Sequence, residues 1–339
     1  MNPIIIIGGG PAGLEAAASL ANNNYSVLLF EKEVSLIQKV KGHYTLFPNF
    51  ASAEEIADKL VNKVANNPLV TLHVGTEIVS VKSHQGQWEV EDRNGEKYHG
   101  SAVLLCTGYE IFDARRKEEL GFGIYDGIIT SEHFEHLLKE GKVVNSIGET
   151  PRRIVFLQCV GSRDEKTGNH YCSKVCCIAA VKQSIDVKKL LPEAEVFCFY
   201  MDLRMSGQFY EELYRQAQED YSIKFIRGRI SEAAGTFDGR IQIKAEDTLV
   251  GLPLKMSTDL LVLMVGMEAS KGTRNLGSCC GLKQEYGFID SKDKHLADNL
   301  TEREGLFLAG SCKRPMNISD CIADARSAAI EIINYLKTK

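Results

Sequence analysis

The chain has 339 residues, 44% of them hydrophobic and 25% charged, which is the composition of an ordinary globular protein of about two domains. Its net charge of −5, with acidic and basic residues interspersed, argues against a nucleic-acid partner, and no apolar run approaches the roughly 20 residues of a membrane-spanning helix. The start carries no signal peptide, so we expect a cytoplasmic protein whose ten cysteines are reduced, buried or bound to metal.

The first residues predict a strand, a glycine-rich turn and a helix. Ile4–Ile7 is a continuous apolar run, as expected of a parallel strand that is buried on both faces. Gly8, Gly10 and Gly13 follow with the spacing G-x-G-x-x-G. In this pattern the first glycine makes the tight turn, the second admits a pyrophosphate close to the backbone, and the third lets the helix pack on the strand. The amides that open the helix Leu14–Ala21 would then hold the phosphates.

A second predicted strand, 26–30, ends at Glu31, where a carboxylate can accept hydrogen bonds from a ribose. The glycine spacing alone is a weak signal, but strand, helix and acid stand in the register of a dinucleotide-binding unit. We therefore predict that this segment binds a dinucleotide. The alternative is a tight turn between strand and helix that binds nothing.

The following region has the alternation of a small antiparallel sheet. Residues 71–103 alternate between apolar and polar side chains, and residues 92–97 predict a turn within them. The next strand runs into Cys106, Thr107 and Gly108, a segment similar to the strand followed by A-T-G of flavoproteins with two dinucleotide-binding domains.

A second series of alternating strands and helices begins after residue 150. The predicted elements are the strand 152–160, the helix 173–190, the strand 195–201, the helix 208–220, and the strands 223–230 and 258–266. This order predicts a second nucleotide-binding domain inserted into the first. An NAD(P)H-dependent protein would carry another G-x-G-x-x-G after the first of these strands, but Gly161 is the only glycine near that turn.

Cysteines occupy the turn instead. The four that lie close together in the chain are Cys159, Cys172, Cys176 and Cys177. Adjacent cysteines make a strained disulfide, whereas four thiolates can hold an iron–sulfur cluster, although the spacing matches neither common ferredoxin run. We predict a cluster; zinc, redox thiols and packing are the alternatives, and the absence of C-x-x-C disfavours a redox disulfide. A second adjacent pair, Cys279 and Cys280, lacks companions, and we expect it to pack or to lie in a loop.

The last part of the chain resembles a second flavin-binding motif. A predicted strand runs into Gly310 and then into a helix that begins near Ile318. The N-terminus of this helix would direct its partial positive charge at the pyrimidine side of a flavin. Lys313 and Arg314 either add to that field or lie in solvent. The acid that usually follows the glycine is absent, and Ser311 stands in its place.

These features together favour FAD over NAD(P). The residues that we expect to contact FAD are Gly8, Gly10, Pro11, Ala12, Gly13, Glu31, Lys32, Thr107, Gly108, Gly310, Ser311, Lys313 and Ile318. No catalytic residue is predicted.

Longer stretches resemble the A subunit of heterodisulfide reductase and extend over nearly the whole chain. They are GYEIFDARRKEELGFGIY, FLQCVGSRDE, YCSKVCC, CFYMDLRMSGQFYEELYRQAQE, KFIRGRI and LFLAGSCKRPMNISD. The resemblance implies an α/β fold of thioredoxin-reductase type with two dinucleotide-binding-type domains. Residues 1–117 and 267–339 would form the FAD domain, and residues 118–266 the inserted module. It also implies FAD, one [4Fe-4S] cluster on the four neighbouring cysteines, and a homodimer.

The implied function is electron transfer, as an oxidoreductase subunit of a complex with B- and C-type subunits. Nothing in the sequence resembles the extra iron–sulfur modules of the methanogen proteins, so we expect one flavin and one cluster. This pattern favours the short A subunit of the heterodisulfide-reductase-like system of sulfur oxidation. The alternatives are the A subunit of a quinone-interacting complex of sulfate reduction, a stand-alone NAD(P)H-dependent disulfide or quinone reductase, and a flavin-bearing scaffold.

Overall fold

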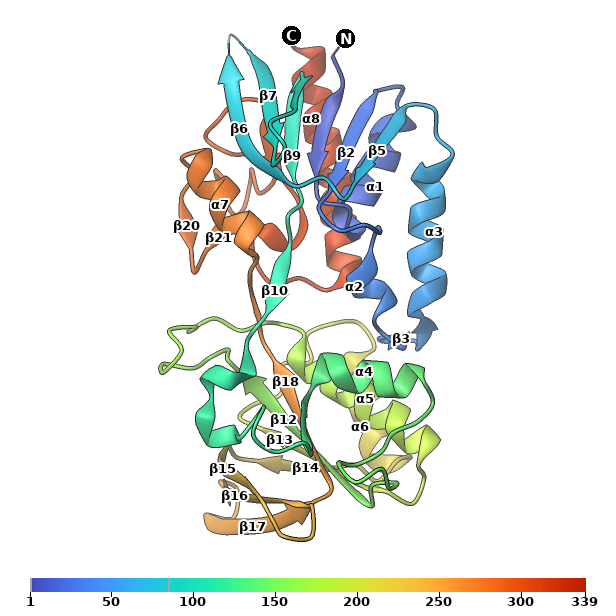
Figure 1. Ribbon diagram of the computed structural model, residues 1–339, viewed down its shortest axis with the longest axis vertical. Coiled ribbons are helices and arrows are strands. Elements are labelled where there is room, and N and C mark those ends of the chain that lie inside the picture. The colour runs from blue at the N-terminus through green and yellow to red at the C-terminus, as the bar shows by residue number, and fades with distance from the viewer. Residues whose placement is uncertain (1, 85) are drawn as a thin grey trace. The chain divides into compact units, whose positions relative to one another are not determined.

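The structure, a computed structural model, describes residues 2–84 and 86–339 (Figure 1). The chain divides into two compact units. The first unit comprises the chain up to Lys41, Glu54–Glu110 and Glu268–Lys339, and the second comprises Gly42–Ala53 and Ile111–Met267. The predicted domain boundaries follow residues 117 and 266, whereas the chain changes units after Glu110 and Met267. The pair of strands β10 (Tyr109–Ile111) and β19 (Met267–Ala269) contains both of these points.

A five-stranded parallel sheet forms the centre of the first unit. Its strands, in sheet order, are β22 (Leu306–Leu308), β9 (Ala102–Leu105), β1 (Ile4–Ile7), β2 (Val27–Glu31) and β5 (Val70–Val74). β1 is buried along its whole length and pairs with β2 on one side and β9 on the other. The small pair β20 (Gln284–Glu285) and β21 (Phe288–Ile289) lies in the same unit. The continuous apolar run at Ile4–Ile7 thus correctly predicted a central parallel strand.

The helices of the first unit are α1 (Pro11–Ala21), α2 (Gln38–Lys41), α3 (Ala53–Ala65), α7 (Lys271–Cys279) and α8 (Ile318–Lys337). α1 and α8 pack against each other, although they come from opposite ends of the chain (Figure 1). α1 can do so because most of its residues are small (alanine, glycine or serine), with Ala16 and Ala17 fully buried. No helix in the described residues is long and apolar enough to cross a membrane.

Two predicted β regions are wrong in part. Within residues 71–103, β5 and β9 belong to the parallel sheet, and only β6 (Ile78–His84), β7 (Gln87–Asp92) and β8 (Lys97–Gly100) form an antiparallel one. β5 has the polar–apolar alternation of an antiparallel strand because it lies at the edge of the parallel sheet, with some of its residues exposed. The predicted strand 223–230 is two strands, since the chain breaks at Gly228, where a Cβ atom would lie 1.9 Å from Glu246 O.

The second unit contains another parallel sheet of five strands. In sheet order they are β11 (Ile128–Thr130), β18 (Leu260–Val265), β12 (Arg153–Val160), β13 (Glu195–Tyr200) and β14 (Lys224–Arg227). Its helices are α4 (Ser131–Lys139), α5 (Cys176–Leu190) and α6 (Tyr210–Glu219), with short 3-10 turns at Ala114–Arg116 and Glu118–Leu120. An antiparallel sheet of β15 (Ile230–Gly235), β16 (Ile241–Asp247) and β17 (Leu252–Thr258) and a hairpin of β3 (Thr45–Leu46) and β4 (Ala51–Ser52) complete it.

β12 organises the core of this unit because both of its faces are buried. Ile154 and Phe156 belong to the core that α4, α5 and α6 cover. Val155 and Leu157 belong to a different core, which they share with residues of the antiparallel sheet. Successive side chains of a strand point to opposite faces, so a slip of one residue would exchange the two cores. The register of β12 is therefore set on both sides.

A buried charge network joins α4, α5 and the β3–β4 hairpin. Lys182 Nζ lies 2.7 Å from both carboxylate oxygens of Glu135 and 3.1 Å from Asp186 Oδ2. Tyr44 N donates to Glu135 Oε2 at 2.9 Å, and Thr45 Oγ1 donates to Asp186 Oδ2 at 2.7 Å. The three charged side chains are only 2–4% exposed. Each buried charge has an opposite charge and further hydrogen bonds, which offsets the cost of removing it from water.

We predict that Glu135→Gln lowers the free energy of unfolding by about 1–3 kcal/mol. Asp186 still balances the charge of Lys182, but the amide nitrogen that replaces one carboxylate oxygen cannot accept the buried hydrogen bonds that Glu135 accepts. Chemical denaturation measures the loss. Glu132→Gln, an exposed change on the same helix, is the control and should change stability by no more than about 0.5 kcal/mol. Equal effects of the two changes would contradict the role of the network.

The same carboxylate predicts a pH dependence. Burial alone would raise the pKa of Glu135, but hydrogen bonding to His43 and the charge of Lys182 lower it to about 2. Folding therefore favours the ionised form, so its contribution is complete above the ordinary value of 4.5 and is lost as the pH falls from 4.5 towards 2. The stability difference between the wild type and Glu135→Gln should shrink over that range.

Candidate functional site

In the G-x-G-x-x-G turn after β1, the packing of the protein has no room for a side chain at Gly8 or Gly13 but leaves space for one at Gly10. A Cβ atom on Gly8 would lie 2.3 Å from Cys106 O, and one on Gly13 would lie 1.9 Å from Gly8 O. Gly10 has an extended backbone with φ −82° and ψ −173°. A Cβ atom on Gly10 would meet no atom of the described residues within 4 Å. The open space beside Gly10 is where the glycine pattern places a pyrophosphate, next to the first turn of α1.

Glu31 lies beside this turn at the end of β2. Its Oε2 accepts a hydrogen bond from Gly9 N at 2.7 Å, and its Oε1 accepts one from Glu33 N at 2.9 Å. Each carboxylate oxygen has a second lone pair, so the group can still accept a ribose hydroxyl. The neighbouring Lys32 ammonium lies 3.7 Å from Glu33 Oε1.

The tertiary structure brings the last motif of the chain next to the first. A Cβ atom on Gly310 would lie 2.8 Å from Cβ of Ala12, which follows Pro11 in the first turn of α1. Gly310 N donates to Asp324 Oδ2 at 2.6 Å. Ser311, which replaces the usual acid, has its Oγ 3.4 Å from Cys321 Sγ. The predicted FAD contacts from both ends of the chain therefore meet at one place.

Lys313 lies in an internal ion-pair network rather than in solvent. Its side chain is 1% exposed, and Nζ lies 2.8 Å from Asp298 Oδ2 and 2.7 Å from Asp324 Oδ1. Arg314 donates to Asp298 through both terminal nitrogens at 2.7 Å. These carboxylates neutralise much of the positive charge locally. Asp324 was not predicted, and its only sequence signal is a second acid one turn after Asp320 on the same helix.

The remaining predicted FAD contacts are held by α7 and by the cap of α8. Thr107 Oγ1 lies 2.7 Å from Thr273 Oγ1, which donates to Gly108 O at 2.8 Å. α8 begins at Ile318 after the cap residue Asn317, as the sequence predicted. Thr107 and Gly108 thus follow the end of β9, and Ile318 opens α8, where the predicted flavin motifs place them.

We predict that Gly10→Val folds but no longer binds flavin, because the protein leaves room for the side chain that a pyrophosphate would collide with. Circular dichroism and the flavin-to-protein absorbance ratio measure the two properties. Gly13→Ala is the contrast: its Cβ would collide with Gly8 O, so it should impair folding itself. Stoichiometric flavin in folded Gly10→Val would disprove the cradle.

The four predicted cluster ligands lie at the two ends of one loop and within it. Cys159 lies at the end of β12 with φ 59°, where the pairing of β12 with β18 shifts register. Cys172 lies in the loop, and Cys176 and Cys177 open α5. The loop follows the carboxyl end of a parallel strand, the position at which nucleotide-binding domains hold phosphate. The helix that was predicted from residue 173 begins later, at Cys176.

The four thiols are close enough to influence one another. Burial raises the pKa of Cys159 to about 12, and the charges of Cys177 and Cys172 contribute to that rise. Burial also raises the pKa of Cys176 well above its usual value, and the other three cysteines add to the effect. In the absence of a bound metal, both thiols therefore stay protonated at neutral pH. Binding a metal cluster would release their protons.

Backbone amides point at two of the sulfurs. Lys174 N donates to Cys172 Sγ at 3.3 Å, and Arg204 N donates to Cys177 Sγ at 3.4 Å. Hydrogen bonds of this kind stabilise thiolates and help to set the reduction potential of an iron–sulfur cluster.

Buried polar atoms next to Cys159 also fit a bound group. Among the described residues, Gln158 Nε2 and Oε1 and Ser162 Oγ are buried without a hydrogen-bond partner. Such groups cost about 1–3 kcal/mol each when they stay unsatisfied. The described residues contain no group of three His, Cys, Asp or Glu side chains already arranged around a metal ion. Each thiolate of a four-iron cluster binds a different iron atom. A four-iron cluster therefore does not require three ligands gathered around one metal ion.

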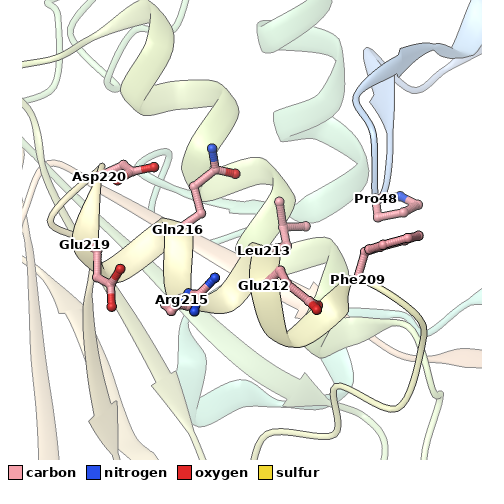
Figure 2. Close-up of a pocket in the computed structure, with 8 residues that line it drawn as sticks. All are labelled: Pro48, Phe209, Glu212, Leu213, Arg215, Gln216, Glu219 and Asp220. Atoms are coloured by element: carbon pink, nitrogen blue, oxygen red, sulfur yellow. The ribbon is translucent and has the colours of Figure 1, made fainter.

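A surface pocket of about 480 Å³ lies along α6, apart from every predicted site residue (Figure 2). It is lined by Pro48, Phe209, Glu212, Leu213, Arg215, Gln216, Glu219 and Asp220. Figure 2 shows Pro48 and Phe209 together at one end. Three carboxylates against one guanidinium make this pocket unfavourable for the phosphates of a nucleotide.

Comparisons with known proteins bear on these sites. The model of the pyridine nucleotide-disulphide oxidoreductase family matches residues 2–149. The chain is 31% identical to the iron-sulfur A subunit of the CoB–CoM heterodisulfide reductase of Methanocaldococcus jannaschii, over 96% of this chain and 63% of the relative. It is 40% identical to the A subunit of the H2/formate:CoB-CoM heterodisulfide,ferredoxin reductase of Methanococcus maripaludis, over 67% of this chain and 36% of the relative. Over nearly its whole length, the chain is thus similar to A subunits of heterodisulfide reductases.

This A-subunit-like chain spans between 36% and 63% of the length of those two relatives. Solved structures confirm the predicted fold class. Thioredoxin reductase of Lactococcus lactis matches the whole chain with a TM-score of 0.69 at 18% identity, and that of T. acidophilum matches 99% of it with a TM-score of 0.68 at 21% identity. The fold is thus that of thioredoxin reductases, with two dinucleotide-binding-type domains, and the family model and the relatives' names support an oxidoreductase.

Proposed function

We propose that the chain is an electron-transfer subunit that holds FAD in its first unit and one [4Fe-4S] cluster in its second. The names of the relatives, several of which are iron-sulfur A subunits, support this proposal. So does the first unit, whose glycine turn, Glu31 and Gly310 motif have the arrangement of an FAD site. A flavin exchanges electrons in pairs and a four-iron cluster exchanges them singly, so the two together would convert between the two modes.

The observation that carries the proposal is the turn after β12. The second unit has the sheet order and crossovers of a nucleotide-binding domain. At the place where such a domain cradles phosphate, this chain has Cys159, a single glycine, and a loop that leads to Cys172 and the two cysteines of α5. Buried thiols cannot bind phosphate, whereas deprotonated they are ligands for iron.

The residues around the proposed cluster have separate roles. Cys159 is left-handed at a shift of register between Leu157 and Val160, after which Val160 still pairs with Val265 before the chain enters the loop. α5 fixes Cys176 and Cys177 relative to the sheet, and the Lys182 network holds α5 against α4. Lys174 N and Arg204 N would donate to bound thiolates. Cys198 is buried, and its Sγ lies 3.2 Å from Ser184 Oγ. We assign it to packing.

We further propose that this chain works with B- and C-type subunits, as a homodimer, in the heterodisulfide-reductase-like system of sulfur oxidation. The support is the sequence resemblance and the designation of the relatives as A subunits. The alternative is the A subunit of a quinone-interacting complex. Identification of the proteins that co-purify with the tagged chain from its own cells distinguishes the two complexes.

The stand-alone NAD(P)H reductase is the second candidate function, favoured by the family model. That match ends at residue 149, before β12 begins, so it does not include the turn at which the nucleotide would bind. The second unit offers neither a glycine cradle nor, in the α6 pocket, a surface suited to phosphate.

We predict that Cys176→Ala loses iron and sulfide but keeps FAD, because the flavin contacts lie in the other unit. Iron, acid-labile sulfide and flavin contents of anaerobically purified protein measure the effect. Cys279→Ala, a change of an exposed cysteine in the first unit, is the matched control and should keep both cofactors. Full iron content in Cys176→Ala would sink the ligand assignment.

We also predict that NADH and NADPH reduce the wild-type flavin slowly or not at all, while a low-potential chemical reductant reduces both centres. The reason is the replacement of the phosphate-binding turn by cysteines. Stopped-flow absorbance with each nucleotide tests this. Rapid bleaching of the flavin at micromolar nucleotide would revive the stand-alone reductase.

A further inference from the structure

The loop between Cys159 and Cys172 folds back on itself and carries an arginine to the thiols. Arg163 N donates to Tyr171 O at 3.0 Å, which places Arg163 beside the segment that ends in Cys172. Arg163 has φ 54°, a left-handed conformation that an arginine rarely adopts. Asn169 Nδ2 donates to Gly161 O at 2.9 Å within the same loop. The loop is therefore a closed, internally bonded structure, and the direction of Arg163 is set by it.

The guanidinium of Arg163 is also anchored by Asp202. It forms a two-point pair with Asp202, in which Nη1 faces Oδ1 and Nη2 lies 3.0 Å from Oδ2. Asp202 O in turn accepts from Cys177 Sγ at 3.8 Å. The Arg163 side chain is 21% exposed, so water screens its charge incompletely.

The charge of this guanidinium reaches the sulfurs. Burial raises the pKa of both Cys159 and Cys177, and in both cases Arg163 acts against that rise, whereas the Asp202 carboxylate adds to it at Cys177. An arginine stays protonated at all working pH values. Its positive charge beside these sulfurs therefore does not vary with pH, although the Asp202 carboxylate neutralises part of it.

We propose that Arg163 sets the reduction potential of the cluster by stabilising its reduced form. The inference rests on the proposed function, because it needs the cluster. Reduction adds one electron, which the flavin would supply, and no bond to Arg163 forms or breaks. The added negative charge lies close to a fixed cation in a partly desolvated loop, so the reduced state gains more than the oxidised state does. Asp202 acts as a positioning residue that holds the guanidinium in place.

The test is a redox titration of anaerobically purified protein, with the cluster followed by electron paramagnetic resonance. Arg163→Gln removes the charge and should make the cluster potential more negative. Arg163→Lys restores the charge and should return the potential towards the wild-type value. Arg240→Gln, which breaks an exposed Arg240–Asp238 pair in the same unit, is the matched control and should leave it unchanged. The flavin potential should stay constant in all three variants.

Arg163→His provides a second test within one protein. The imidazole gains its charge as the pH falls through about 6.5, so the cluster potential should rise over that interval more than it does in the wild type. An unchanged potential in Arg163→Gln, or the same pH response in Arg163→His and wild type, would overturn the proposal. Loss of iron from both variants would overturn it in favour of a structural role. A wild-type protein without iron would instead refute the proposed function.

Discussion

The register of β12 is the constraint on which the second unit depends. Its alternate residues enter two separate cores, so neither a slip nor a rotation of the strand is tolerated. The irregularity must then fall at the end of the strand, after Leu157, where pairing with β18 shifts. Cys159 takes a left-handed conformation there, and the chain leaves the sheet after Val160, which still pairs with Val265. The position of the cysteine loop is a consequence of how tightly the strand before it is packed.

The buried charges of α5 fix the position of the other end of the cysteine loop. Helix α5 carries Cys176 and Cys177 in its first turn and Lys182 one turn further on. Lys182 is bound to Glu135 of α4, and both helices bind the hairpin at Tyr44 and Thr45 through their carboxylates. Paired charges specify one arrangement because any other would leave a buried ion alone. The ends of the loop are thus held by a doubly packed strand and by an ion-paired helix.

In the first unit, close contacts rather than charges define the site. Gly8 and Gly13 are needed so that β1, β9 and α1 can approach one another, and Gly10 is free of such contacts. Gly310 closes against Ala12, and Asp324 holds its amide in the absence of the acid that usually follows this glycine. Asp324 also pairs with Lys313, so one carboxylate orients the turn and neutralises a buried cation. The flavin motif is therefore maintained by a residue that lies outside it.

The sequence by itself determined most of the local elements and is the source of the chemistry proposed for both candidate sites. The run Ile4–Ile7, the glycine spacing and the cysteine count each reflect interactions between near neighbours, which spacing records directly. It also indicated the two α/β series, and the fold was recognisable from their order. It did not reveal that β5 lies at a sheet edge, since an edge strand alternates like an antiparallel one.

Only the tertiary structure decided which distant residues meet. The pairing of Asp324 with Gly310, of Arg163 with Asp202, and of Lys182 with Glu135 joins segments that have no periodic relation in the chain. Such contacts arise from the packing of helices on sheets, and an acid or base in the sequence gives no sign of its partner. For the same reason the segment Gly42–Ala53 groups with the second unit although its neighbours in sequence belong to the first. Its hydrogen bonds to Glu135 and Asp186 outweigh its place in the chain.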